Sequence, residues 1–224
     1  MALITCPDCG REISEYAESC PGCGCPSSVW QKTEMPSSLQ VGDRYTMGTW
    51  GGKPIEWRVL EVSEGSALLI TEKVIDVLPY NAQYTGVTWE TCSLRRWLSN
   101  TFLNQAFDDD ERWRIKRVRL ETPLNRAHGT PGGNATVDRI FCLSVGELDR
   151  YFEGDRDMRT APTDYAKAKG VYVQAGSALW WLRSPGAGNS SAIGVGTFGG
   201  FMWDGWKVFR DDVGVRPAMW ITLN

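Results

Sequence analysis

Trp180-Trp181-Leu182-Arg183-Ser184-Pro185-Gly186 opens the stretch of sequence that decides the fold, and Gly214-Val215-Arg216-Pro217-Ala218-Met219-Trp220 closes it. Residues 187–213, between these two blocks, are rich in Gly and Ser. They also carry five large aromatic residues at spacings of 3, 2, 3 and 3, namely Phe198, Phe201, Trp203, Trp206 and Phe209. Such spacings match neither the alternation of a strand nor one face of a helix, so the five rings cannot share a single buried face.

Two interpretations of this stretch are open. In the first, residues 187–213 form a β-meander with Gly-Gly and Asp-Gly turns, and the aromatic side chains pack beneath their neighbours. In the second, the segment is a presented surface, because aromatic and charged residues are mixed as in recognition patches. The charged residues in question are Asp204, Lys207, Arg210, Asp211 and Asp212. Composition by itself favours neither interpretation.

The composition indicates one domain of ordinary size with a small appendage. The chain has 224 residues, of which 42% are hydrophobic and 11 are Trp, so a substantial core can form. A net charge of -3 argues against a protein that coats nucleic acid through electrostatics. No apolar run has the length of a membrane span, and the N-terminus lacks the pattern of a secretion signal. We therefore expect a cytoplasmic protein with no membrane partner.

The first 26 residues contain two Cys-x-x-Cys motifs, each followed by Gly. These motifs supply four thiolates at the spacing of a tetrahedral Zn²⁺ site, from Cys6, Cys9, Cys20 and Cys23. Cys25 could replace Cys23 as a ligand, and the alternative to a metal site is a set of unrelated free thiols. A segment this short has too little core to fold unaided, so the metal would supply the missing stability. The segment resembles the zinc ribbons at the N-termini of many bacterial proteins.

Charge and composition define the role of residues 1–26 and the segment after them. The ribbon has one Arg, Arg11, against four acidic residues, so it should repel phosphate, and a structural or protein-contact role is favoured. Residues 27–40 contain Pro and Ser residues that interrupt regular secondary structure, and they have little apolar content. This composition predicts a linker. The main domain is then expected over residues 41–224.

The pattern from residue 41 onward predicts an α+β domain. Alternation over residues 54–62 and an apolar run over 67–71 indicate a hairpin, and residues 140–143 read as a buried strand. Ser93 is expected to cap a helix, Asp108 to Glu111 to begin a second one, and Ser144 with Glu147 to form a capping box. A further short helix is predicted over residues 163–169.

The residues offer weak support for catalysis. The chain has a single histidine, His128, in a polar loop, whereas most general-base schemes place a histidine beside a nucleophile and a carboxylate. Residues 194–199 match Gly-x-Gly-x-x-Gly by count, but they are not followed by a helix of a βαβ unit. Cys92 and Cys142 stand in apolar contexts and are expected to be buried as small hydrophobes.

The two terminal blocks resemble the signatures of a bacterial domain family of unassigned function, common in gut Firmicutes. Its members share W-W-L-R-S-P-G and G-V-R-P-A motifs, which stand here at residues 180–186 and 214–218. The resemblance extends to residues 57–60, 89–95 and 141–144, and so covers nearly all of residues 41–224. The family is similar in layout to the C-type-lectin-like and formylglycine-generating-enzyme-like folds. That group includes the variable proteins of diversity-generating retroelements, whose C-terminal residues are mutagenised to produce new ligand-binding surfaces.

The resemblance implies a fixed scaffold at 180–186 and 214–220 and a presented set within residues 190–212. Val195, Met202 and Val208 would then be apolar anchors, and Trp203→Ala or Trp206→Ala should leave the melting temperature unchanged. The implied ligand-binding residues are Phe198, Phe201, Trp203, Asp204, Trp206, Lys207, Phe209, Arg210 and Asp211.

The function implied is binding of a protein or other macromolecular ligand. Two alternatives remain open: an enzyme related to the formylglycine-generating group with altered chemistry, and a scaffold whose zinc ribbon makes the contact. The sequence lacks the C-terminal Cys pair of formylglycine-generating enzymes and the Glu-Pro-Asn signature of calcium-dependent lectins. Oxidase activity and calcium-dependent sugar binding are therefore not implied.

Overall fold

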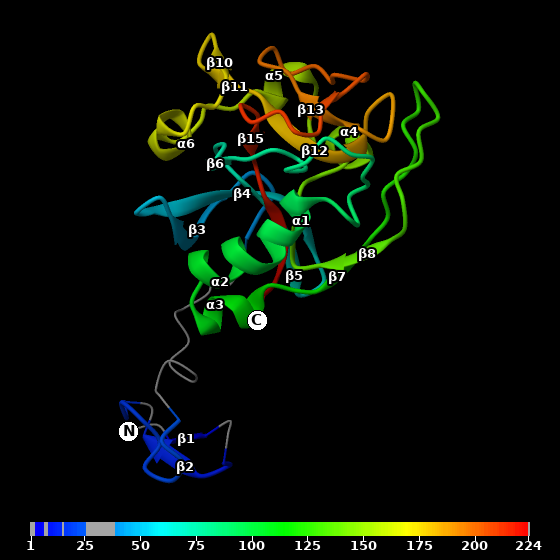
Figure 1. Cartoon of the computed structure of the whole chain (residues 1–224). Helices are drawn as coiled ribbons and strands as arrows, with labels where there is room; N and C mark the ends of the chain where they lie inside the picture. Colours follow the sequence, from blue (N-terminus) through cyan, green and yellow to red (C-terminus); the bar gives the residue numbers. More distant parts are fainter. Residues whose placement is uncertain (1–2, 7–8, 15, 26–38, 224) are drawn as a thin grey trace. The chain divides into compact units, whose positions relative to one another are not determined.

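A computed structural model describes residues 3–6, 9–14, 16–25 and 39–223. The chain divides into two compact units, one within Met1–Ser38 and one over Leu39–Thr222 (Figure 1). The predicted linker, residues 27–40, lies outside the described residues except for Leu39 and Gln40. In the part of the chain that is described, no helix has both the length and the apolar character required to cross a membrane.

The N-terminal unit is built on a two-stranded antiparallel sheet. Strand β1 (Leu3–Thr5) pairs with β2 (Glu12–Ser14), with Ile4 opposite Ile13. Its core is small and consists largely of sulfur, with Cys6, Cys20 and Cys25 buried around Ile13. Among the described residues of this unit, so little apolar material cannot hold a fold by itself, which agrees with the need for an additional stabilising group.

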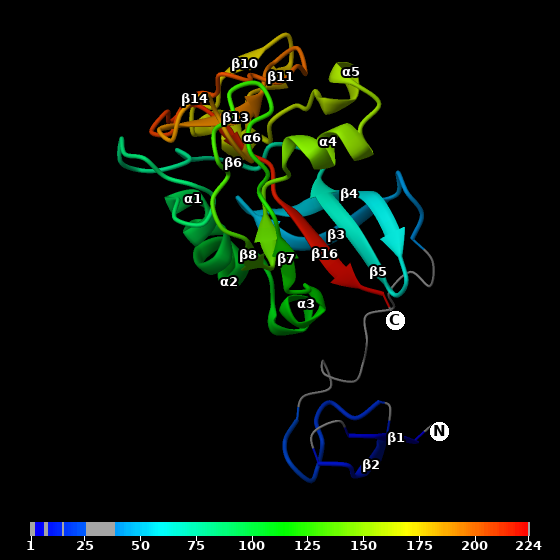
Figure 2. The same cartoon turned by 90° about the vertical axis from the view of Figure 1, so that its right-hand side faces the viewer.

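The first sheet of the larger unit is antiparallel throughout, in the order β3-β4-β5-β16-β9. The predicted hairpin is confirmed: β4 pairs with β5, and every residue of β5 is buried. Strand β16, from the second signature block, is inserted between β5 and β9 (Figure 2). The strands span Arg44–Trp50 (β3), Lys53–Ser63 (β4), Ser66–Thr71 (β5), Ile140–Phe141 (β9) and Ala218–Thr222 (β16).

The second sheet has the order β14-β13-β12-β15-β6 and brings the two signature blocks side by side. Strand β12, from the first block, pairs in parallel with β15, from the second, and Trp180 lies opposite Gly214. The other pairs are antiparallel. After β15 the chain crosses to the first sheet as β16, so the last block joins both sheets. The strands span Asp76–Val77 (β6), Trp180–Pro185 (β12), Ser191–Val195 (β13), Trp206–Lys207 (β14) and Gly214–Val215 (β15).

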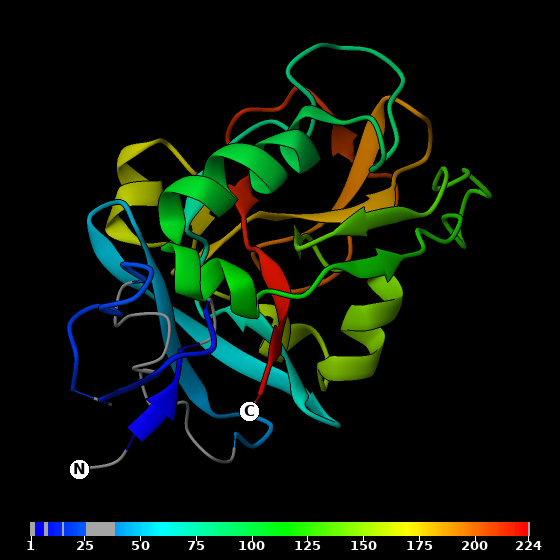
Figure 3. The same cartoon turned by 90° about the horizontal axis from the view of Figure 1, so that it is seen from below.

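A helical run covers the first sheet, where η2 contacts β9 and α2 contacts β3; it is the green segment of Figure 3. The run begins one residue earlier than predicted, because the N-cap is Cys92, whose sulfur accepts from the Arg95 N–H at 3.4 Å, and not Ser93. Cys92 and Cys142 are fully buried, as predicted. The run contains α1 (Ser93–Trp97), the π-helical turn η2 (Leu98–Phe102), α2 (Leu103–Ala106) and, after a break, α3 (Asp109–Arg114).

The other predicted helix starts are confirmed. The capping boxes of Asp108 with Glu111 and of Ser144 with Glu147 are both formed. The remaining helices are α4 (Val145–Tyr151), α5 (Asp155–Met158) and α6 (Asp164–Ala168). Two small hairpins complete the described elements: β7 (Val118–Leu120) with β8 (Thr136–Asp138), and β10 (Val173–Gln174) with β11 (Ser177–Ala178). The larger unit is thus a mixed α+β domain in which strands predominate.

The two signature arginines are buried. Arg183 forms an ion pair with Glu147 and donates to the carbonyls of Cys142, at 3.0 Å, and Glu121, at 3.1 Å. Arg216 donates to the Thr71 carbonyl at 2.9 Å. Buried guanidinium groups are tolerated only when they are hydrogen-bonded, so these contacts fix both signature blocks to the elements around them.

Candidate functional site

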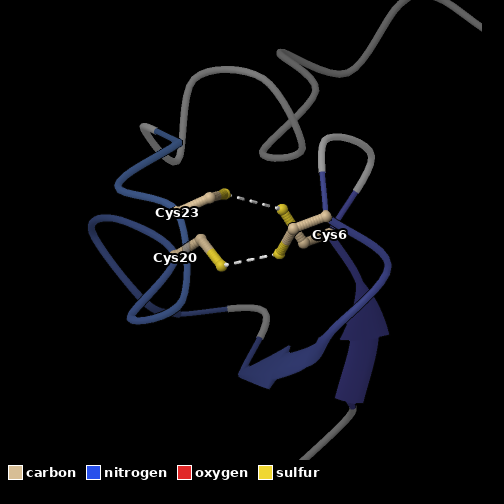
Figure 4. Close-up of side chains that lie close together, drawn as sticks. Cys6, Cys20 and Cys23 are labelled. Atoms are coloured by element: carbon tan, nitrogen blue, oxygen red, sulfur yellow. Dashed lines mark hydrogen bonds between the residues drawn. The ribbon is translucent and has the colours of Figure 1, made fainter.

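Four cysteines of the N-terminal unit bring their sulfurs together. The Sγ atoms of Cys6, Cys9, Cys20 and Cys23 all lie within 4.8 Å of one another. The Sγ atoms of Cys6 and Cys23 are 3.7 Å apart, and those of Cys9 and Cys20 are 3.6 Å apart. Figure 4 shows the side chains of Cys6, Cys20 and Cys23 turned toward a common centre. The cluster can therefore hold one metal ion.

The same backbone hydrogen bond closes each Cys-x-x-Cys-Gly motif. The Gly10 N–H donates to the Cys6 carbonyl at 2.9 Å, and the Gly24 N–H donates to the Cys20 carbonyl at 2.8 Å. Both glycines have positive φ, +73° and +75°, which explains why a glycine follows each motif. The repeated turn presents two sulfurs from each loop to the same point.

The backbone prepares at least one sulfur for metal binding. Burial opposes ionisation of the Cys20 thiol, but the N–H groups of Gly22 and Cys23, together with hydrogen bonds from the Cys9 and Cys6 thiols, lower its pKa to about 6. The pKa of Cys23 moves the other way: a backbone hydrogen bond at Cys25 lowers it, but burial and the contacts with the other three sulfurs raise it to about 12. The Gly22 N–H lies 3.4 Å from the Cys20 sulfur. Because thiolates and not thiols bind metals, the environment of Cys20 favours the ligand form of this one residue. Cys25 is buried in the core of this unit and is not part of the four-sulfur group.

The C-terminal segment offers a second candidate site, which we call the C-terminal surface and define as the nine predicted ligand-binding residues between Phe198 and Asp211. Five of the nine are exposed: Phe198, Asp204, Lys207, Phe209 and Asp211. The other four are partly buried: Phe201, Trp203, Trp206 and Arg210. The nine residues therefore divide into an exposed group and a partly buried group.

Trp206 is one of the four partly buried residues. Its ring packs edge-on against Trp181, with centroids 5.7 Å apart, and the Arg210 guanidinium lies 5.2 Å from its centroid. Gly194 lies directly beneath, so close that an added Cβ would stand 2.1 Å from Cζ3 of Trp206. Trp206 is therefore part of the packed frame on one side and part of the surface on the other.

Two of the three predicted apolar anchors are buried, and the third is not. Val195 and Val208 are fully buried, as predicted, but Met202 is 43% exposed, so its side chain is not a buried anchor. Residues Ser191–Val195, which fall in the range predicted to be presented, form strand β13 and are mostly buried. The presented part is the chain after this strand, whose backbone is fixed at several points. The fixing hydrogen bonds run from Met202 N–H to the Gly194 carbonyl, from Ala187 N–H to the Asp204 carbonyl and from Val208 N–H to the Ser190 carbonyl.

A residue far away in the sequence, Tyr84, joins the C-terminal surface. Its ring makes an edge contact with Phe209, with centroids 5.1 Å apart, and the Lys207 ammonium lies 5.5 Å from its centroid. Tyr84 is 61% exposed. Hydrogen bonding to the Ser190 and Lys207 side chains lowers the pKa of Tyr84. Nothing in the sequence near Tyr84 indicates this neighbourhood, because only the fold brings the loop before α1 to β14.

The other end of the surface is formed with the loop that holds His128. Phe201 and Trp203 make an edge contact at 5.6 Å, and the Arg126 guanidinium lies 5.6 Å from the Trp203 centroid. His128 Nε2 lies 2.8 Å from Asp204 Oδ1. A pocket of about 210 Å³ opens beside Trp203, and its apolar lining includes Leu124, Val145 and Ile193. The single histidine is thus a neighbour of the surface.

Comparison with known proteins places the larger unit in a family. No curated protein and no solved structure matches the chain. The family model described as "Domain of unknown function (DUF6273)" matches residues 64–223, which agrees with the expected domain family of unassigned function. Since the matched region contains more than half of the residues, this chain belongs to the DUF6273 domain family.

Proposed function

We propose that this chain is a ligand-binding protein: a zinc ribbon attached to a C-type-lectin-like domain that offers its C-terminal surface to a protein ligand. The observation that carries the proposal is the exposure of Phe198, at 65%, and Phe209, at 48%, among exposed charges of both signs. Large exposed rings beside charges are typical of contact surfaces and have a hydration cost in the free protein.

The way the surface is held supports the proposal. Backbone hydrogen bonds fix the segment to β13 and to the strand ends, whereas the side chains of Phe198, Lys207 and Phe209 point to solvent. The backbone position of the segment therefore does not depend on which side chains it carries at these three exposed positions. These residues can change without loss of the fold. A rigid backbone also lowers the entropic cost of binding, because little must be ordered on contact.

The surface has features that suit a protein ligand. The rings of Tyr84, Phe209 and Trp206 offer apolar contact, while Lys207 and Asp204 offer charges of opposite sign. The pocket beside Trp203, at about 210 Å³, has room for one apolar side chain of the ligand. Aromatic anchors with a pocket beside them are where binding energy concentrates in protein interfaces.

We infer that the metal of the cysteine cluster is zinc. A tetrahedral ion with Zn–S bonds of about 2.3 Å places its sulfurs about 3.8 Å apart. The observed separations of 3.7 and 3.6 Å agree with this value. Zinc would supply structure in this unit, since four thiolates close the coordination shell and leave no position for substrate.

Site-specific photo-crosslinking tests the binding role. A benzophenone amino acid at position 209 should cross-link a protein partner in extract of the source organism, whereas the same group at position 137 should not. Val137 is the matched control because it is also 48% exposed and lies outside the C-terminal surface. Tyr84→Ala should reduce the adduct at position 209. Equal adducts from both positions, or none from either, would contradict the proposal.

Gene variation tests whether the surface is diversified. If it is, copies of this gene should differ mainly at codons for Phe198, Asp204, Lys207, Phe209 and Asp211, with a reverse transcriptase gene and a near-copy of the last coding segment nearby. The scaffold blocks at 180–186 and 214–220, which are buried except for the partly exposed Trp220, should be unchanged. Differences spread evenly along residues 180–220 would instead identify an ordinary, non-diversified binding surface.

A further inference from the structure

The pocket beside Trp203 restricts what the C-terminal surface can receive. Its volume is about 210 Å³. The rest of its lining comes from the loop that holds His128, from the start of α4 and from the strands β12 and β13. Figure 1 shows α4, β12 and β13 in the same part of the domain. Segments that are far apart in the sequence therefore meet at this pocket, and the groups that they offer define the chemistry of its occupant.

The walls of the pocket are held together by Asn125, which is buried. Its side-chain amide donates to the carbonyls of Pro185, at 3.0 Å, and Trp203, at 2.9 Å. Its Oδ1 accepts from the Ala127 N–H at 2.9 Å. One side chain thus joins the His128 loop, the end of β12 and the backbone of the C-terminal surface. Because these segments are fixed to one another before contact, little rearrangement is needed to fill the pocket.

The interior of the pocket suits an apolar group. Ile193 and Val145 line it and are buried. The polar side chains in the lining already have partners: the Ser184 hydroxyl accepts from the Val145 N–H at 3.0 Å, and the Ser144 hydroxyl donates to Glu147 at 2.8 Å. A polar group that entered would lose its water and would have to compete for these partners, whereas an apolar group would not.

The volume indicates the size of that group. An apolar cavity of about 150 Å³ holds one benzene molecule, which has six carbon atoms, so about 210 Å³ corresponds to about eight. A phenylalanine side chain, with seven carbon atoms, comes closest to this value. A leucine side chain, with four, would leave a void, and a tryptophan side chain, with ten non-hydrogen atoms, would be too large. Trp203 in the wall also offers a ring for an aromatic contact.

The charge beside the pocket indicates what stands next to the ring. Among the described residues that line the pocket, Arg126 alone is charged. Its side chain is 62% exposed, and its guanidinium lies 5.6 Å from the centroid of Trp203. The ion pair of Arg126 with Asp149 uses one of its five N–H donors, so a second carboxylate can also bind. An acidic residue is therefore favoured beside the ring, and a basic one is disfavoured.

On the basis of the proposed binding role, we propose that the protein ligand inserts a phenylalanine side chain into this pocket and places an acidic residue beside it on Arg126. The ring packs on Ile193 and against Trp203. The carboxylate accepts a hydrogen bond from Arg126, which lies over the same tryptophan ring. The ligand is thus a protein segment in which phenylalanine has an aspartate or glutamate as its neighbour.

NMR titration of the full chain with the peptide acetyl-Asp-Phe-Asp-amide tests this assignment. The peptide should bind in the millimolar range and shift the methyl signals of Ile193 and the indole N–H signal of Trp203. The Asp-Leu-Asp peptide should bind about 4-fold more weakly, which corresponds to at least one buried CH₂ group lost. The Asn-Phe-Asn peptide should bind about 2-fold more weakly, as expected for loss of an exposed ion pair. No shift of these signals, or equal binding of either altered peptide, would overturn the proposal.

A glycine in the lining allows the pocket to be filled from within. Gly146 is the second residue of α4, and an added Cβ would meet no atom of the surrounding elements within 4 Å. Gly146→Leu should therefore fold, occupy part of the pocket and weaken binding of the peptide about 10-fold. Gly188→Leu is the matched control, because Gly188 has equally open surroundings but does not line the pocket. If the two variants bind the peptide alike, the pocket is not its site.

The cross-link at position 209 separates this assignment from the proposed function. Gly146→Leu should reduce the adduct with the partner, and Gly188→Leu should not. An adduct that Gly146→Leu leaves unchanged would overturn the assignment of the pocket while the proposed function stands. Peptide binding in the pocket without any adduct at position 209 would support the preference of the pocket for phenylalanine and contradict the proposed function.

Discussion

Replacing Trp206 with alanine should destabilise the larger unit, in contrast to the expectation from sequence. The ring is partly buried and packs on Trp181, on the backbone of Gly194 and under the Arg210 guanidinium. Removal of the ring would leave these three neighbours without contact on one side. The loss should therefore be close to that of a core aromatic residue, and not to that of a displayed one.

The expected size follows from the buried area. A tryptophan buries up to about 250 Å², and about two thirds of this at 25 cal/mol per Å² gives about 4 kcal/mol. Because the unfolded chain already buries part of this area, about 3 kcal/mol is the better value. Phe198 is 65% exposed, so Phe198→Ala should cost about 1 kcal/mol or less. Trp206→Phe keeps a ring at the site and should recover about half of the loss.

Urea unfolding followed by far-UV circular dichroism measures these differences. Circular dichroism is preferred to fluorescence because the chain has 11 Trp, and loss of one alters the emission directly. Excess zinc keeps the N-terminal unit constant across variants. In a thermal scan the Trp206→Ala loss corresponds to about 6–12 °C for a domain of this size. A Trp206→Ala loss no larger than that of Phe198→Ala would show that the ring is displayed and that the packing argument is wrong.

Three further predictions concern other contacts. Cys6→Ser should abolish binding of the one zinc ion per chain, measured by mass spectrometry, and leave the unfolding transition of the larger unit unchanged. A zinc ion retained by this variant would refute the four-sulfur site. Tyr84 should ionise at lower pH than an ordinary tyrosine, because the Ser190 hydroxyl and the Lys207 ammonium favour the phenolate. Lys207→Ala should therefore raise the pKa of Tyr84, measured by NMR titration of tyrosine-labelled protein. If the pKa of Tyr84 is the same in this variant, the contact with Lys207 is excluded. Glu147→Ala should lower the free energy of unfolding in urea by about 3 kcal/mol, because Arg183 would remain buried without its carboxylate partner. A decrease under about 1 kcal/mol would show that the burial of Arg183 does not depend on Glu147.

The sequence determined those features that depend on neighbouring residues. The Cys-x-x-Cys-Gly turns, the capping boxes and the β4–β5 hairpin are local, since each is formed by residues a few positions apart and has a known spacing. The burial of Cys92 and Cys142 also follows from their local apolar contexts. These predictions succeeded because a short segment has few alternative structures.

Only the tertiary structure decided which side chains meet across the chain. The pairing of β12 with β15, the approach of Tyr84 to Phe209 and the contact of Trp206 with Gly194 all join residues that the sequence separates. The pocket beside Trp203 arises in the same way. A spacing pattern describes one segment at a time, whereas burial of a ring depends on what another segment places above it. For this reason the C-terminal rings could be recognised in the sequence, but their division into frame and surface could not.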